Sequence, residues 1–362
     1  MVKIIFYQLT NNEKKKIIFR CDGATLPQIG TGHVRRDIAI ADMLVKRKIC
    51  LQKEISFVTR RHGSFKLGYG LVKKAGYFVE MIEDKYLEWN SKQEASSLSK
   101  VKTDILILDR LSTTKNCMSH LIGKFKSLVS MDDIGSGAKI ADVVINGIFH
   151  DLSPKKNRYI GYKYLFLKNT DLLLKKKINK RVKNIVVSFG GYDKRNIIKF
   201  FLNSLLNKNC LLEKPLNIEL LVGEEHHKVI NAWQKLIKNI LVDRKIKINL
   251  LVLPADYFKR LAKADLAIVS GGLTVFDSIS RGVPVIGLPQ YRHQLKTLIN
   301  LENKNVIKLG SLRMKLDKEN FINLFNKMII SFEDRIFLSK NSIDLVDRKG
   351  SERVLNILRT LF

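Results

Sequence analysis

The chain alternates short apolar runs with longer amphipathic stretches, and this alternation starts a second time beyond a polar, Lys-rich segment at 152–182. Runs such as 105–108 and 266–269 are apolar throughout, which is typical of strands buried on both faces of a parallel sheet. The stretch 34–47 carries apolar residues at three- and four-residue spacings, which predicts a helix with one buried face. Two successive series of this kind predict an α/β protein with two Rossmann-like, doubly wound domains.

The same pattern predicts where the strands and the domains lie. We expect strands of the first series at 17–19, 55–58, 78–82, 105–108, 127–131 and 143–145. We expect strands of the second series at 184–189, 218–222, 248–252, 266–269, 285–288 and 306–309. The predicted domains are 1–165 and 166–345, followed by a C-terminal helix over 346–362 that packs back on the first domain.

Length and composition limit the class of protein. The chain has 362 residues and is 45% apolar, which is enough for two buried cores. No apolar run approaches the roughly 18 residues of a membrane helix, and the first residues turn polar too soon for a signal peptide, so we expect a cytoplasmic protein. The four cysteines form no CxxC pair and are expected to be reduced, buried thiols. Histidines and acidic residues do not cluster, so no metal site is expected.

The net charge is strongly positive. Lys and Arg number 65 against 34 Asp and Glu, which gives +31. Such an excess can attract nucleic acid, anionic lipid or phosphorylated metabolites. The lysines are scattered among Ile, Leu and Asn, which favours biased usage on solvated surfaces, and no nucleic-acid-binding motif with interleaved aromatics is present. We expect no nucleic-acid partner, whereas peripheral contact with an anionic membrane remains open.

Ligands of doubly wound sheets bind beyond the carboxyl ends of the strands, and four loops of interest fall there. The first follows the strand at 17–19 and contains Asp22, Gly30, Gly32, His33 and Arg36 as candidate substrate-binding or catalytic residues. Glycines let the backbone approach a ligand closely, and amides at a helix start attract anions. His33, at the head of the predicted helix, could take a proton from water or a hydroxyl. The alternative is a structural histidine that caps the helix.

Of the four loops, the third along the chain, which begins at Ser270, combines the largest number of ligand-binding features. Ser270, Gly271 and Gly272 follow a buried strand, and Thr274 lies at the start of the next predicted helix. Backbone amides and the Thr274 hydroxyl at this position could bind a diphosphate. Asp277 lies one turn further and could accept the two hydroxyls of a ribose. The alternative for Asp277 is a capping-box carboxylate that closes the same helix start.

The second and fourth loops along the chain give weaker indications of ligand binding. Gly190 and Gly191 end a strand and suit the approach of a phosphate or a sugar, although a tight strand–helix turn needs the same residues. His293 and Gln294 come after the predicted strand at 285–288, which has a proline on each side. Polar side chains at this position can reach toward a ligand beyond the end of the sheet. A lone histidine such as His293 is otherwise an ordinary surface residue.

Several separated motifs together resemble one known family. These motifs are Phe19–Gly23, Ile29–Arg36, Val187–Asp193 and Ala264–Gly272. With them the chain is similar to the UDP-sugar hydrolases of the pseudaminic acid pathway and the related spore-coat polysaccharide proteins, which have a GT-B fold like that of the glycosyltransferase that makes lipid II. The tail Leu345–Val354 resembles the closing helix of that family. The resemblance implies two domains that face each other across a cleft.

The resemblance also implies a reaction. The family hydrolyses a UDP-linked diacetamido-trideoxyhexose to UDP and the free sugar, by attack of water on the anomeric carbon with inversion and without a cofactor. His33 would be the base, Gly271 and Gly272 would hold the diphosphate, and Asp277 would hold the uridine ribose. The chain departs from the family pattern at Leu273, where a serine is usual, and at Asp277, where a glutamate is usual.

Two other functions fit the same sequence. An inverting GT-B glycosyltransferase would use His33 to deprotonate the hydroxyl of a lipid-linked or glycan acceptor, with a UDP-sugar as donor. A non-catalytic nucleotide-sugar-binding protein would not need a base at that position. The sequence leaves the exact sugar and the oligomeric state open.

Overall fold

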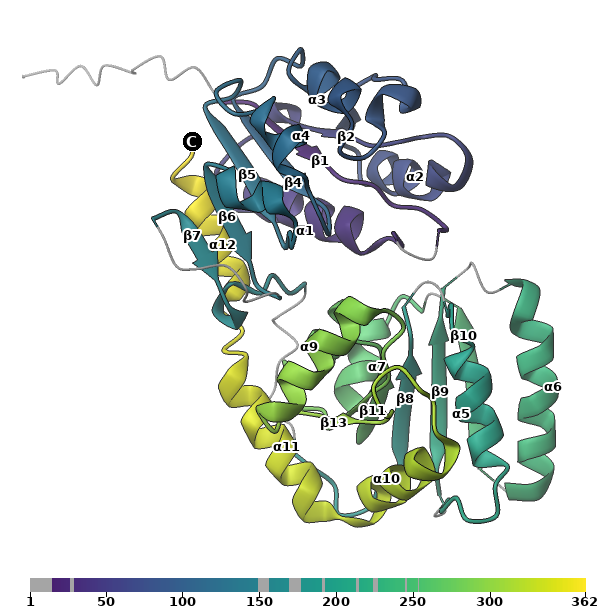
Figure 1. The fold of residues 1–362 in the computed structure, drawn as a ribbon. Helices are drawn as coiled ribbons and strands as arrows, with labels where there is room; N and C mark the ends of the chain where they lie inside the picture. Colours follow the sequence, from purple (N-terminus) through teal and green to yellow (C-terminus); the bar gives the residue numbers. More distant parts are fainter. Residues whose placement is uncertain are drawn as a thin grey trace, which may run out of the picture.

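The computed structural model describes residues 15–26, 29–148, 156–168, 177–190, 193–212, 215–223, 227–244, 246–252 and 254–362. Within them, the strands form two parallel sheets, each flanked by helices on both faces (Figure 1). The first sheet has the order β3-β2-β1-β4-β5-β6-β7 and the second has the order β10-β9-β8-β11-β12-β13. The central strand pairs are β1–β4 and β8–β11, so the strand order reverses beside β1 and beside β8.

The strands of the first sheet are β1 (Ile17–Arg20), β2 (Ile55–Val58), β3 (Phe78–Val79), β4 (Ile105–Asp109), β5 (Ser127–Met131), β6 (Val143–Asn146) and β7 (Arg158–Ile160). Those of the second sheet are β8 (Asn184–Ser188), β9 (Asn217–Val222), β10 (Lys247–Val252), β11 (Leu266–Val269), β12 (Val285–Gly287) and β13 (Lys308–Leu309). The α-helices are α1 (Gly32–Lys46), α2 (Lys66–Lys74), α3 (Lys92–Leu98), α4 (Lys115–Ser119), α5 (Ile197–Leu205), α6 (His227–Arg244), α7 (Tyr257–Lys263), α8 (Leu273–Ile279), α9 (Arg292–Asn303), α10 (Lys318–Ile330), α11 (Phe332–Leu345) and α12 (Gly350–Arg359).

Successive side chains of each buried strand enter different cores, which explains why these runs are apolar throughout. Ile105 and Ile107 of β4 pack in one core with α1 and α12, whereas Leu106 and Leu108 pack in another with α3 and α4. The second sheet divides its strands in the same way between a core with α5, α6 and α10 and a core with α8. The predicted two-sheet α/β fold is therefore confirmed.

The C-terminal helix returns to the first sheet. Val354 and Leu358 of α12 are fully buried in the core that contains β1 and α1. Ser351, near the start of α12, accepts a hydrogen bond from the Leu167 amide at 3.0 Å and donates one to the Leu167 carbonyl at 2.8 Å. The chain thus crosses between the two halves near residue 167 and again between α11 and α12 (Figure 1).

Three strands differ from the sequence-based prediction. The strand expected at 78–82 ends at Val79, and the strand expected at 306–309 pairs only over Lys308–Leu309. β7 was not predicted, because its residues are only half-buried at the edge of the sheet and give no apolar run. All four cysteines are buried and unpaired, as expected. Among the described residues, no helix is long and apolar enough to cross a membrane.

Candidate active site between the two domains

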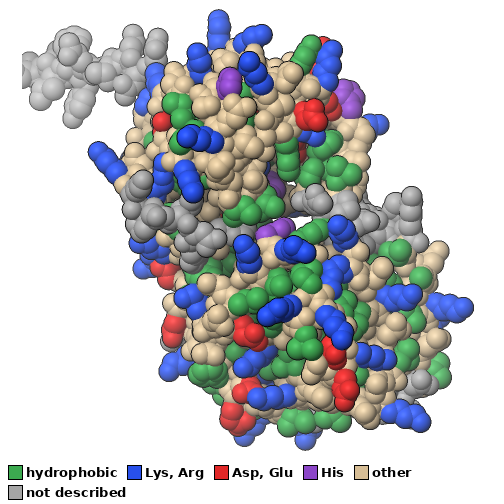
Figure 2. Space-filling model, viewed as in Figure 1, with side chains coloured by type: hydrophobic (Ala, Val, Ile, Leu, Met, Phe, Trp, Pro, Cys, Tyr) green, Lys and Arg blue, Asp and Glu red, His purple; other side chains and the backbone are tan. Residues whose placement is uncertain are grey.

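A cavity of about 280 Å³ lies where the carboxyl ends of the two sheets face each other (Figure 2). Figure 2 shows histidine side chains in the hollow between the two halves of the molecule. The first half contributes Ile29, Gly30, Thr31, Gly32, His33, Arg36, Leu111, Asp132 and Ile148. The second half contributes Phe189, Gly190, Ser270, Gly271, Gly272, Leu273, Thr274, Gln290, Tyr291, His293 and Gln294.

Most of the predicted site residues therefore line one cavity. Gly30, Gly32, His33 and Arg36 come from the first predicted loop, and Gly190, Ser270, Gly271, Gly272, Thr274, His293 and Gln294 come from the other three. Asp22 and Asp277 do not line it. Gly191 lies outside the described residues.

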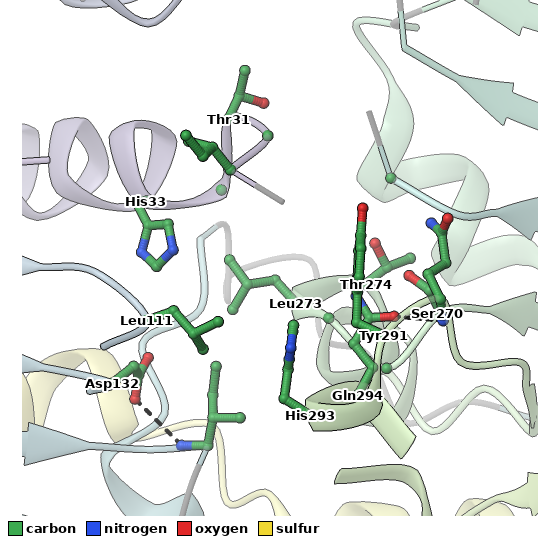
Figure 3. A pocket seen from close by; sticks show the side chains of 18 of the residues that line it. Thr31, His33, Leu111, Asp132, Ser270, Leu273, Thr274, Tyr291, His293 and Gln294 are labelled. Carbon is green, nitrogen blue, oxygen red and sulfur yellow. Dashed lines mark hydrogen bonds between the residues drawn. The ribbon is translucent and has the colours of Figure 1, made fainter. Parts of the chain in front are cut away.

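His33 is the second residue of α1 and points into the cavity (Figure 3). Its Nδ1 lies 2.6 Å from Oδ1 of Asp109, the last residue of β4. Burial raises the pKa of Asp109, but the adjacent Arg36 and His33 lower it more strongly, so its pKa lies well below the ordinary range. An ionised carboxylate can only accept hydrogen bonds, so Nδ1 of His33 carries the hydrogen, and in the neutral ring the lone pair belongs to Nε2.

Arg36 joins His33 to a second carboxylate. Its Nε and Nη2 donate to the two oxygens of Asp109 at 2.7 and 2.5 Å, and its Nη1 donates to Asp132. Asp132 also accepts from the amides of Gly147 and Ile148, at 2.7 and 3.3 Å. Because its side chain is 4% exposed and its guanidinium pairs with two carboxylates, Arg36 holds Asp109 beside His33 rather than offering a free cation to a ligand.

The two glycines of the Ser270–Thr274 loop have different surroundings. A Cβ on Gly271 would lie 2.6 Å from the Gln294 carbonyl oxygen, so only glycine lets this loop pack against α9. A Cβ on Gly272 would meet only Gln294 Nε2, at 3.6 Å. Gly271 therefore fixes the loop, and Gly272 leaves its backbone open to the cavity.

Gln290 and Gln294 connect the loops that the second half contributes to the cavity. The backbone amide of Gln290 donates to Oε1 of Gln294 at 2.9 Å, so Nε2 of Gln294 faces the glycine loop. Gln290 Nε2 donates to the Phe189 carbonyl at 2.6 Å, and its Oε1 accepts from the Lys194 amide at 2.9 Å. These bonds hold the ends of β8 and β12 together at the cavity.

His293 faces His33 from the opposite half (Figure 3). Its ring stacks on Tyr291, with centroids 5.5 Å apart and an interplanar angle of 4°. Burial, and after it the nearby His33, lower the pKa of His293, which favours the neutral imidazole. The alternative of an ordinary surface residue is wrong for His293, because it is half-buried in the cavity wall.

Asp22 does not line the cavity, so this predicted substrate-binding residue lies outside the candidate site. Its carboxylate forms an ion pair with Arg20 at 2.8 Å and accepts hydrogen bonds from the Arg60 amide at 2.8 Å and Trp89 Nε1 at 2.7 Å. Arg20 and Asp22 are both buried. These donors use the carboxylate inside the first half, which leaves Asp22 as a residue that anchors the loop after β1.

Asp277 lies on α8, one turn beyond Thr274, and is also outside the cavity lining. Its side chain is 15% exposed and lies 3.7 Å from Nη1 of Arg281. Burial raises the pKa of Asp277 to about 7, although Arg281 opposes the rise. The capping-box alternative is wrong, because the cap of α8 is Gly272, which has no side chain, and Asp277 is already the fifth residue of the helix.

Sequence reasoning missed the partners of the predicted residues. Asp109 is the last residue of one buried strand and Asp132 directly follows another, which is the signal that could have identified them. Gln290 and Tyr291 lie in the loop from which only His293 and Gln294 were chosen. The described residues contain no cluster of three or more His, Cys, Asp or Glu side chains that could hold a metal ion.

Comparisons with known proteins give relatives of low identity. No protein-family model matches the chain. An uncharacterised protein of Methanocaldococcus jannaschii is 28% identical over 298 residues, which span 78% of this chain and 56% of that protein, so the chain covers little more than half of its length. The spore coat polysaccharide biosynthesis protein SpsG of Bacillus subtilis is 25% identical over 275 residues, or 72% of this chain and 78% of SpsG.

Two solved structures show the fold. MurG of Acinetobacter baumannii has a TM-score of 0.66 at 17% identity, covering 96% of this chain and 99% of MurG. UDP-GlcNAc 2-epimerase of Neisseria meningitidis, solved with UDP-GlcNAc bound, has a TM-score of 0.58 at 11% identity, covering 95% and 99%. The chain has the two-domain α/β fold of the GT-B class, as expected.

Proposed function

We propose that the protein is a nucleotide-sugar hydrolase that releases UDP and a free sugar from a UDP-sugar, in the synthesis of a nonulosonic acid of the pseudaminic type or of another surface polysaccharide. The observation that carries the proposal is the His33–Asp109 pair, which faces an uncharged, glycine-rich wall across one cavity. The similarity to a spore coat polysaccharide protein, and to an enzyme fold solved with a UDP-sugar, supports the substrate class.

The two walls suit opposite ends of such a substrate. The first wall carries the buried carboxylates of Asp109 and Asp132, which would repel a diphosphate. Within the described residues, the lining of the second wall contains no carboxylate and offers the amides of the Ser270–Thr274 loop. We therefore place the diphosphate against the second wall and the anomeric carbon beside His33.

The reaction follows from that placement. Water held between His33 and the sugar forms a bond from its oxygen to the anomeric carbon, on the face opposite UDP. The bond from that carbon to the diphosphate oxygen breaks, and its electron pair leaves with UDP. The proton of the water passes to Nε2 of His33, and the Asp109 carboxylate stabilises the resulting imidazolium through Nδ1.

Incubation with candidate UDP-sugars in the absence of an acceptor tests this function. Mass spectrometry would follow both UDP and the freed sugar. We expect release of both products by the native protein and loss of release in His33→Ala. If the native protein releases no UDP from any UDP-diacetamido-trideoxyhexose, the proposed hydrolase is wrong.

An inverting glycosyltransferase is the second candidate, favoured by the charge. Lys and Arg side chains are spread over the visible face of both halves (Figure 2), and the chain carries a net +31. Such a surface would attract an anionic, lipid-linked acceptor. In that case UDP release would require the added acceptor or membranes, and would weaken as salt is raised.

A further inference from the structure

Asp37 carries a buried carboxyl group that has no role in the proposed reaction. It lies on α1, directly after Arg36 and four residues beyond His33, and it is 0% exposed. His33 and Asp37 are one helical turn apart, so both lie on the face of α1 that meets β4. Neither carboxyl oxygen of Asp37 has a hydrogen-bond donor among the described residues.

A buried carboxylate without donors is unfavourable, whereas a neutral carboxyl needs only one acceptor for its own O–H. The neighbouring Asp109 carboxylate can serve as that acceptor. Among the described residues, its Oδ1 accepts from His33 and from Arg36 Nη2, and its Oδ2 accepts from Arg36 Nε alone. A carboxylate offers about four lone-pair sites, so one site on Oδ2 is left for Asp37.

The groups around Asp37 favour its protonated form. Burial, and after it the neighbouring Asp109 carboxylate, raise the pKa of Asp37 well above its ordinary range, while Arg36 and the Cys21 thiol oppose the rise. Burial, followed by Asp37, likewise raises the pKa of Cys21, so this thiol is no competing base. Asp109 from β4, Arg36 from α1 and Cys21 beyond β1 are the titratable or charged groups that face Asp37.

The charge of the cluster follows from this protonation state. With neutral Asp37, the single positive charge of Arg36 and the two negative charges of Asp109 and Asp132 leave one net negative charge. That charge is cancelled when His33 accepts a proton. An ionised Asp37 would add a third carboxylate and hold the proton on His33 more tightly.

We propose that Asp37 is a positioning residue that stays protonated and donates its hydrogen to Asp109, so that a chain from Asp37 through Asp109 to His33 orients the base and limits how strongly it holds a proton. The role in catalysis rests on the proposed hydrolase function. The site of the proton does not, and it can be measured without turnover.

Infrared difference spectroscopy tests where the proton lies. We would compare the native protein with Asp37→Asn at about pH 9, roughly two units above the pKa of about 7 of Asp277, so that Asp277 is ionised. We expect a carbonyl band of a protonated carboxyl that disappears in the variant. Absence of that band in the native protein would overturn the proposal, whether or not the protein hydrolyses UDP-sugars.

Kinetics test the link to His33. Asp37→Asn keeps a neutral donor, so we expect near-native kcat and pH profile. Asp37→Leu removes the donor, and we expect kcat to fall about tenfold with little change in KM, and the acid limb of the pH–rate profile to move to higher pH. Cys21→Ala, on the other side of Asp37, is the matched control and should leave the profile in place. Equal losses in Asp37→Asn and Asp37→Leu, with unchanged pH profiles, would contradict a donor role.

Discussion

The two walls of the cavity are built on different chemistry although both begin with a glycine loop after a parallel strand. The Gly30–His33 loop leads into an ionic cluster, in which His33 and Arg36 are tied to Asp109. The Ser270–Thr274 loop faces neutral groups, namely the Gln294 amide and the stacked His293 and Tyr291 rings. The difference teaches that a glycine loop after a parallel strand can lead into an ionic cluster on one side and a neutral wall on the other, and under the proposed function these would serve proton transfer and anion binding.

Exchanging the two histidines for alanine should give the largest difference between the walls. We expect His33→Ala to lower kcat about a thousandfold, because it removes a general base. We expect His293→Ala to raise KM about tenfold with a much smaller change in kcat, because it removes one neutral contact. Steady-state kinetics on the best UDP-sugar would measure both. Similar kcat losses in the two variants would erase the distinction between a catalytic and a binding wall.

The two neighbouring glycines provide a matched pair within the second wall. Gly271→Ala would force a Cβ to 2.6 Å from a backbone oxygen of α9, so we expect a loss of about 2 kcal/mol in the free energy of unfolding. Gly272→Ala meets only ordinary contacts, so we expect native stability but UDP binding weakened about tenfold. Thermal unfolding and UDP titration separate the two effects. Native UDP affinity in Gly272→Ala would remove the diphosphate from this loop.

The smallest expected effect is a pH dependence of binding through Asp277. The pKa of Asp277 is raised by burial to about 7, so the folded protein binds more protons there than the unfolded chain between about pH 4 and pH 7. Stability from this group is thus greatest at low pH and falls as pH rises through that window. If the ionised carboxylate accepts the ribose hydroxyls, UDP-glucose affinity should rise about tenfold from pH 6 to pH 8.

Asp277→Asn is the control for that pH dependence. The amide does not titrate, so calorimetric titration should give an affinity for UDP-glucose that is flat between the same pH values. UDP-glucose is preferred to UDP as the probe, because the terminal phosphate of UDP itself titrates near pH 6. A pH dependence that persists unchanged in Asp277→Asn would assign the ribose to another residue.

Much of the fold was predictable from the sequence, because apolar runs such as Ile105–Leu108 mark strands whose alternate side chains fill two cores. The site was predictable only in its loops. The Asp109 partner of His33 is 76 residues away, and their contact depends on β1 and β4 being neighbours, which local patterns do not specify. Asp22 looked like a ligand residue because buried Arg20, its partner, is indistinguishable in sequence from a surface arginine.

The fate of a labelled water oxygen tests the central claim most directly. The hydrolysis would be run without an acceptor in water enriched in heavy oxygen, and both products would be weighed by mass spectrometry. Attack of water on the anomeric carbon, with His33 as the base, predicts the label in the free sugar and none in UDP. Label in the phosphate of UDP would mean that a phosphorus–oxygen bond breaks instead, and would contradict the placement of the anomeric carbon beside His33.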